Sequence, residues 1–214
     1  MYKAYDSLME KAYKKAKADR TFTLFLVIVL LLTTTIFIFS KFIYISVRVD
    51  GGSMNPTLNS GDVLFANKNL TPKEGDIIVI DGEKESKDGK GYELLIKRAI
   101  AIGQKGKTTI VRIIHDKIWV GDSDQTLVPI DEDYYLTEGT KTPIGSSNKD
   151  RWELAEGEIF FLGDNRINSK DSRSEEYGTC DIKQVVGVVP EWAVKIRPIS
   201  GFLYKVGQFF SNLI

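Results

Sequence analysis

The longest apolar stretch of the chain lies close to its N-terminus. Residues 21–40 (TFTLFLVIVLLLTTTIFIFS) contain no charged side chain. A run of about 20 apolar residues is long enough, as a helix, to cross the hydrocarbon core of a bilayer. The threonines within it are compatible with a helix, because a helical hydroxyl can donate to the carbonyl group one turn back. The pattern predicts a transmembrane anchor over residues 21–40.

Two other interpretations of this stretch are weaker. A cleaved secretory signal has an apolar run of only about 7–15 residues, with small residues before its cleavage site. Here the run is longer and continues into Lys41 and FIYISVRV. A helix buried in a soluble core is seldom apolar on every face over so long a stretch. Residues 1–20 carry six basic and three acidic side chains. The positive-inside rule therefore places residues 1–20 in the cytoplasm, and the chain after about residue 41 on the other side of the cell membrane.

Short apolar segments separated by turn residues make up most of residues 41–198. The segments are rich in β-branched and aromatic side chains, and sequences such as Asn59-Ser60-Gly61 between them favour turns. Many short strands at close spacing predict a mainly β domain, antiparallel and coiled or barrel-like. Residues 137–157 are polar, and we expect them to form a surface excursion. The predicted strands are residues 42–49, 62–66, 76–80, 93–102, 108–114, 117–120, 158–162, 185–189 and 193–196.

The end of the chain has a different periodicity. Apolar side chains recur at steps of three and four residues, which predicts a short amphipathic helix over residues 199–214. Such a helix is too short to cross a membrane, so we expect it to dock onto the β domain or to lie at the membrane surface. Its apolar positions are Phe202, Leu203, Val206, Phe209, Phe210 and Leu213.

Composition argues against several classes of function. The 29 basic and 29 acidic side chains leave no net charge, so a nucleic-acid partner has no electrostatic support. One cysteine, Cys180, cannot form an internal disulfide, and one histidine, His115, cannot build a histidine-rich metal site. We expect neither a metal nor another cofactor. His115 lies at a predicted hairpin turn without a serine motif, so a Ser-His-Asp protease is not indicated.

Ser53 and Lys97 are the candidate reactive groups. Two glycines precede Ser53 and permit a tight turn that leaves its hydroxyl approachable, although Gly-Gly-Ser is most often only a loop. Lys97 lies inside the apolar strand ELLIKRAIAI. It is either on the wet face of the strand, with its amine in water, or a buried amine with a lowered pKa that can accept a proton. The adjacent Arg98 points to the opposite face and favours the neutral amine. Strand position alone favours the wet face.

Residues 163–173 (GDNRINSKDSR) follow the apolar strand EIFFL and are dense in side chains that hydrogen-bond one another. With three shorter sequences in the expected order, they give the chain a resemblance to bacterial type I signal peptidases over roughly residues 20–198. The shorter sequences are residues 53–57 (SMNPT), 61–64 (GDVL) and 96–100 (IKRAI), the last with Ala99 where the family usually has valine.

The resemblance implies a role for each matching residue. Ser53 corresponds to the nucleophile, whose backbone N–H donates to the oxyanion, and Lys97 corresponds to the general base. Ser169 corresponds to a hydroxyl that orients the lysine amine. Some family members have a serine two residues before the nucleophile as a second oxyanion donor, where this chain has Gly51. The supporting positions are Arg98, Asp164, Arg166, Asp171 and Arg173.

The resemblance also implies a membrane-bound endopeptidase that removes N-terminal signal peptides from exported preproteins after an Ala-x-Ala-like site, through an acyl-enzyme. The expected partners are these preproteins and the lipid bilayer. An extended peptide that adds to a strand edge presents alternate side chains to one wall, so two shallow apolar pockets would select small residues. We expect Val47, Val49, Met54 and Pro56 to contribute to substrate binding.

Three alternatives belong to other classes. Lysine-dependent self-cleaving repressors share the Ser/Lys chemistry, but they carry DNA-binding domains and no membrane anchor. A non-catalytic or dedicated-substrate relative that assists the assembly of surface polymers such as pili would keep the fold. The presence of both Ser53 and Lys97 speaks against the non-catalytic version. An anchored binding or adhesion domain needs neither residue.

Overall fold

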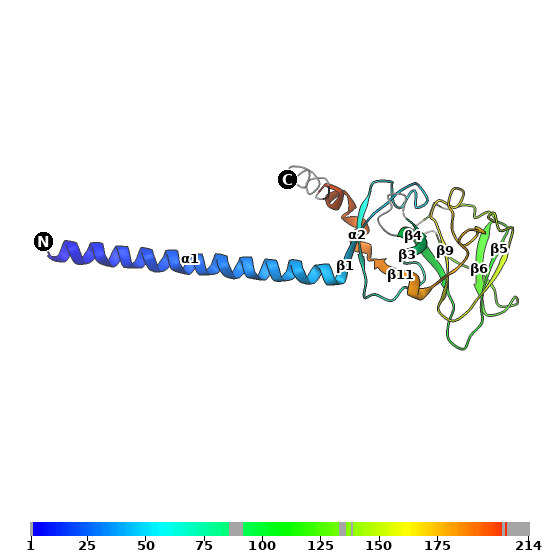
Figure 1. Ribbon diagram of the computed structural model, residues 1–214, viewed down its shortest axis with the longest axis horizontal. Coiled ribbons are helices and arrows are strands. Elements are labelled where there is room, and N and C mark those ends of the chain that lie inside the picture. Colours follow the sequence, from blue (N-terminus) through cyan, green and yellow to red (C-terminus); the bar gives the residue numbers. More distant parts are fainter. Residues whose placement is uncertain (1, 86–91, 133–135, 138, 203, 205–214) are drawn as a thin grey trace. The chain divides into compact units, whose positions relative to one another are not determined.

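The structure is a computed structural model that describes residues 2–85, 92–132, 136–137, 139–202 and 204 (Figure 1). The chain divides into two compact units, Met1–Ile43 and Tyr44–Ile214.

The first unit is a single helix, α1 (Tyr2–Ile43). Its part from Met9 to Ile43 is long and apolar enough to cross a membrane, and none of its most apolar window is buried inside the protein. The threonine hydroxyls donate back along the helix as expected, for example Thr34 Oγ1 to the carbonyl of Leu30 at 2.7 Å. The helix is longer than the predicted anchor, because it includes the basic segment before residue 21 and continues to Ile43.

The second unit consists mainly of two antiparallel sheets, which confirms the predicted mainly β fold. The larger sheet has the strand order β1-β2-β11-β3-β4-β9-β10, and the smaller has the order β7-β6-β5-β8. The strands of the larger sheet are β1 (Tyr44–Arg48), β2 (Val63–Asn67), β3 (Ile77–Glu85), β4 (Tyr92–Ile102), β9 (Glu158–Leu162), β10 (Cys180–Asp181) and β11 (Val185–Val189). Those of the smaller sheet are β5 (Thr109–Ile114), β6 (Lys117–Gly121), β7 (Val128–Pro129) and β8 (Arg151–Leu154).

The two sheets share part of their core. Figure 1 shows β5 and β6 grouped apart from β3, β4 and β11. A buried apolar cluster joins the groups, because it takes side chains from β4 and β9 as well as from β5, β6 and β8. Within it the rings of Trp152 and Phe160 lie 4.7 Å apart between centroids. The strand β8 lies inside the segment expected to be a surface excursion, so that segment contributes to the smaller sheet.

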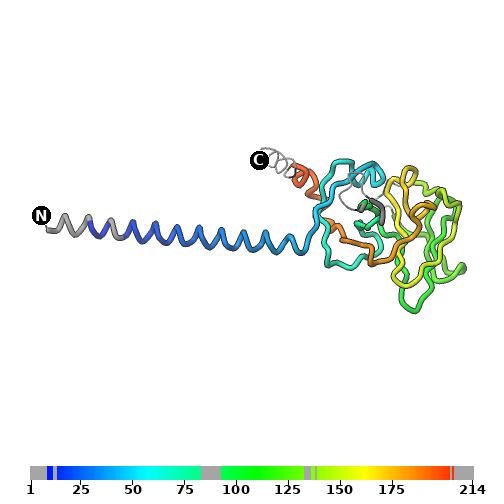
Figure 2. Tube along the Cα trace, in the orientation of Figure 1, coloured from blue at the N-terminus to red at the C-terminus, as the bar shows by residue number. Residues whose placement is uncertain are grey.

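The C-terminal part of the chain returns to the N-terminal strands, as the orange trace in Figure 2 shows. Strand β11 pairs with both β2 and β3. A short 3-10 helix, η1 (Ile182–Gln184), precedes β11, and α2 (Glu191–Lys195) follows it. Residues 193–196 were expected to form a strand, but 193–195 belong to α2, which begins after Pro190 at the N-cap. Trp192 of α2 packs edge-on against Tyr44, at 5.7 Å between ring centroids.

The predicted C-terminal amphipathic helix is only partly described. Residues 197–202 are helical. Ser200 Oγ donates to the carbonyl of Val63 at 2.5 Å, which ties this helix to the start of β2. Residues 203 and 205–214, with most of the predicted apolar positions, lie outside the described residues.

Candidate active site

Ser53 lies in a loop between β1 and β2, residues 49–62, which we call the Ser53 loop. The loop is closed at its base, since the Val49 N–H donates to the carbonyl of Asp62 at 2.9 Å and the Gly61 N–H donates to the carbonyl of Val49 at 2.9 Å. Met54 and Leu58 anchor it in the apolar core. The loop therefore holds Ser53 on a well-packed turn.

Gly51 allows the turn that precedes Ser53. Its φ of +84° is in the left-handed region, which side chains other than glycine rarely adopt. A serine at this position would therefore be strained. The Gly51 N–H donates to the Ser60 hydroxyl at 3.3 Å.

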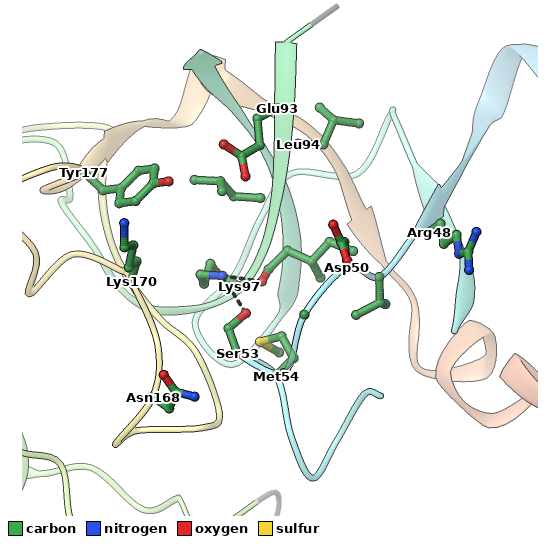
Figure 3. Close-up of a pocket in the computed structure, with 15 residues that line it drawn as sticks. Arg48, Asp50, Ser53, Met54, Glu93, Leu94, Lys97, Asn168, Lys170 and Tyr177 are labelled. Carbon is green, nitrogen blue, oxygen red and sulfur yellow. Dashed lines mark hydrogen bonds between the residues drawn. The ribbon is translucent and has the colours of Figure 1, made fainter. Parts of the chain in front are cut away.

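Lys97 reaches Ser53 from the central strand β4. Its Nζ donates to Ser53 Oγ at 2.9 Å and to the carbonyl of Ile96 at 3.2 Å (Figure 3). The residue is only 5% exposed, so the wet-face interpretation of Lys97 is wrong. Burial, the largest effect, lowers the pKa of Lys97, while the carboxylates of Asp171, Glu93 and Asp164 act in the opposite direction. A buried amine with a lowered pKa beside a hydroxyl is suited to accept the hydroxyl proton.

The loop after β9, residues 163–173, holds the backbone of Ser53. The Asn165 N–H donates to the carbonyl of Ser53 at 3.0 Å, and Asn165 Nδ2 donates to the carbonyl of Gly52 at 3.0 Å. Gly163 permits this close approach, because a Cβ at that position would lie 2.3 Å from the Ser53 carbonyl oxygen and 2.3 Å from Ser169 Oγ. The two loops therefore meet at their backbones, and the contact requires glycine.

Asp164 connects this loop to β4 and to the Ser53 loop. Arg98 donates to its carboxylate through Nε at 2.8 Å and through Nη2 at 2.5 Å, and Thr57 Oγ1 donates to it at 2.6 Å. The side chain of Asp164 is fully buried, and that of Arg98 is only 6% exposed. The carboxylate thus holds three parts of the site in one place.

A second buried ion pair braces the 163–173 loop from within. Arg173 donates to both carboxylate oxygens of Asp171, each at 2.8 Å. Asp171 also accepts from the Gly163 N–H at 3.1 Å. The fully buried Arg166 side chain lies in the same region, where it pairs with Glu132 and donates to Thr142 Oγ1 at 2.9 Å.

Ser169 lies beside Gly163 but does not make the expected hydrogen bond to the Lys97 amine. Its Oγ is buried and makes no hydrogen bond to any residue that the structure describes. The hydrogen bonds found for the Lys97 amine go to Ser53 and Ile96. The role of Ser169 in orienting Lys97 stays a prediction.

Several supporting residues were not singled out by the sequence analysis. Asn165 is part of the 163–173 motif, but no sequence signal distinguishes it from Asn168 on the same loop. Thr57 belongs to the SMNPT motif without an assigned role. Glu132, the partner of Arg166, lies in a segment with no motif at all. Only the folded chain brings these residues to the site.

A cavity of about 570 Å³ opens in front of Ser53 and Lys97. One wall is the chain from Arg48 to Met54 and the other is β4 from Glu93 to Lys97. Figure 3 shows Lys170 and Tyr177 on one side of the cavity, with the Lys97 amine directed at the Ser53 hydroxyl. Of the predicted substrate-binding residues, Val49 and Met54 line the cavity, whereas Val47 is buried in the core and Pro56 is exposed and does not line it.

The lone histidine and cysteine lie away from this cavity. His115 has φ of +50° in the turn between β5 and β6, as expected for a hairpin turn. Cys180 is buried in the core, and burial raises the pKa of its thiol to about 12. Among the described residues, no three or more His, Cys, Asp or Glu side chains gather where they could hold a metal ion.

Comparison with known proteins identifies the family. The family described as signal peptidase, peptidase S26, matches residues 20–192 of the chain. The chain belongs to this family. Signal peptidase I of Streptococcus pneumoniae serotype 4 is 30% identical over 198 residues, which cover 78% of this chain and 87% of the relative. Signal peptidase I of Bacillus caldolyticus is 31% identical over 188 residues, which cover 82% of this chain and 91% of the relative.

Among solved structures, a signal peptidase I from Enterococcus faecalis matches 56% of this chain and 98% of its own, with 22% identity and a TM-score of 0.38. The sequence comparisons show that the chain is a peptidase of the signal peptidase family. Its N-terminal apolar helix fits a protein with a single membrane-spanning segment.

Proposed function

We propose that this chain removes N-terminal signal peptides from exported preproteins by a Ser/Lys mechanism, with Ser53 as the nucleophile and Lys97 as the general base. The observation that carries the proposal is the 2.9 Å hydrogen bond between the buried Lys97 amine and the Ser53 hydroxyl. A lysine acts as a base only when it is neutral, and burial favours the neutral amine.

The reaction follows from this pair. Neutral Lys97 Nζ takes the proton of the Ser53 hydroxyl as the oxygen attacks the scissile carbonyl carbon. The backbone N–H of Ser53 donates to the oxyanion that forms. The tetrahedral intermediate collapses, the bond to the leaving amine breaks, and the ammonium of Lys97 gives its proton to that amine. A water molecule then attacks the Ser53 ester while Lys97 Nζ accepts its proton; the ester bond breaks, the new carboxyl terminus leaves, and the ammonium of Lys97 returns the proton to Ser53 Oγ.

The substrate peptide binds along β4. Strand β3 pairs with one side of β4 as far as Tyr92, whereas β9 pairs with the other side from Arg98 onward. On the edge of β4 opposite β3, the residues before Arg98 are not paired with β9, and they face the cavity. An extended peptide can add its backbone to the strand there. Val49 and Met54 offer apolar surface near Ser53, which suits small side chains at an Ala-x-Ala-like site.

The anchor defines where the reaction takes place. Basic residues dominate the chain before residue 21, so the positive-inside rule favours a cytoplasmic N-terminus. The β domain then lies outside the cytoplasm and next to the membrane. Exported chains emerge there while their signal peptides still hold them to the bilayer.

The test is cleavage of a preprotein with an Ala-x-Ala site by the full chain in detergent, with the product identified by mass. We expect one cut after the second alanine, and no product with Ser53→Ala. Ser123→Ala, in an exposed turn after β6, is the matched control and should cut like the parent. A parent that leaves several preproteins intact, in lipid as well as in detergent, would contradict the proposal.

A further inference from the structure

The oxyanion that Ser53 generates needs hydrogen-bond donors, and the Ser53 N–H is one of them. Its direction is fixed, because the carbonyl of Gly52 in the same peptide unit accepts from the Asn55 N–H at 3.2 Å and from Asn165 Nδ2 at 3.0 Å. In a trans peptide the N–H points away from the carbonyl oxygen. Within the described part of the chain, no residue accepts a hydrogen bond from the Ser53 N–H.

The residue two positions before Ser53 does not supply a second donor. Gly51 has no side chain, and its N–H already donates to the Ser60 hydroxyl. Its φ of +84° also disfavours a side chain at that position. A second donor therefore has to come from another group close to Ser53.

Asn55 lies in a suitable place. The turn from Gly52 to Asn55 folds its carboxamide back over Gly52, so that its Nδ2 is 3.0 Å from where a Cβ on Gly52 would stand. The Gly52 Cα is two bonds from the Ser53 nitrogen, so a carboxamide held against Gly52 lies in the neighbourhood of the Ser53 N–H. The residue is exposed, and its side chain makes no hydrogen bond to any residue that the structure describes.

We propose that Asn55 is a catalytic residue, whose side-chain N–H group donates to the oxyanion together with the backbone N–H of Ser53. The inference rests on the proposed function, because it assigns a role in the same acyl-transfer reaction. An amide donor is suited to this role, since it carries no charge that would compete with Lys97. Glycine at position 52 leaves the space that the carboxamide occupies.

The experiment compares kcat and KM of the full chain in detergent, on one preprotein, for the parent, Asn55→Leu and Asn55→Asp. Leucine has a similar size without the donor, and aspartate has the same shape with a negative charge. Losing one oxyanion donor lowers kcat by about 10²–10³-fold. We expect that loss for Asn55→Leu with KM within about threefold, and at least as large a loss for Asn55→Asp.

Asn59→Leu is the matched control, since Asn59 is exposed on the same loop. It should retain the kcat of the parent, and melting temperatures should show that all variants are folded. If the parent cuts and Asn55→Leu keeps its kcat within about threefold, or changes KM alone, Asn55 is not an oxyanion donor. If the parent cuts no preprotein, the proposed function is wrong and this inference with it.

Discussion

Removing the charge of Asp164 should destabilise the β domain strongly. Its fully buried carboxylate accepts three hydrogen bonds, two from Arg98 and one from Thr57. The substitution Asp164→Asn leaves the buried guanidinium of Arg98 without this carboxylate. Breaking a buried ion pair from one side costs about 3–5 kcal/mol, because one charge then stays in the interior without compensation.

The expected change in melting temperature follows from the size of the domain. A domain of this length loses about 2–4 °C per kcal/mol, so Asp164→Asn should melt roughly 6–20 °C below the parent. Thr57→Val removes one hydrogen bond to the carboxylate, worth about 1.5–3 kcal/mol, and should have a smaller effect. The double variant Arg98→Met/Asp164→Leu removes both charges, and apolar replacement of a buried pair is often neutral. It should therefore melt above Asp164→Asn.

The assay is thermal unfolding of the full chain in detergent, followed by tryptophan fluorescence. Trp152 and Trp192 lie in different parts of the β domain, so both report on its cooperative unfolding. A melting temperature of Asp164→Asn within about 2 °C of the parent would rule out this electrostatic explanation, since a broken buried pair should lower the melting temperature by much more. A double variant that melts below Asp164→Asn would refute it too.

Three further predictions concern catalysis. Since burial lowers the pKa of Lys97, kcat should rise with pH as its ammonium loses a proton. Glu93→Gln removes a carboxylate that raises the pKa of Lys97, so the rising part of the kcat–pH profile should move to lower pH. If the rising part does not move, it does not report the titration of Lys97. Gly163→Ala should lower kcat by about 100-fold or more in preprotein cleavage, because the added Cβ displaces the reacting serine. Gly201→Ala, where a Cβ meets open space, is its control and should leave kcat unchanged. Arg197→Gln removes a 2.8 Å hydrogen bond to a carbonyl of the Ser53 loop; we expect a several-fold lower kcat with KM little changed, and an unchanged kcat would show that this bond does not position the loop.

The anchor and the strands were predictable because their signals are local. A long charge-free run predicts a helix that is apolar enough to cross a membrane, and alternating β-branched segments predict strands. Local patterns misled where tertiary context decides. Residues 193–196 have a strand-like composition, but Pro190 and Glu191 begin a helix there. Arg151–Leu154 is polar at every second position and was not recognised as the edge strand β8.

The pairing of Ser53 with Lys97 could not be read from spacing, since the two residues are 44 positions apart in the sequence. It was anticipated only through the resemblance to a family. The contacts of Asn165 with Ser53 and Gly52 depend on the close approach of two loops at Gly163, which no pattern encodes. Sequence motifs thus identified the residues of the site, and the folded chain supplied their partners.

The proposed mechanism depends on a neutral Lys97 amine that takes the proton of Ser53. Its most direct test is the single-turnover rate of preprotein cleavage by the parent, Lys97→Met and Lys97→Arg. Arginine keeps the positive charge but cannot lose its proton in a protein. Both variants should cut at least about 100-fold more slowly than the parent, because general-base catalysis is lost. A Lys97→Arg variant that cuts within about tenfold of the parent would contradict this mechanism, since no neutral amine would then be needed.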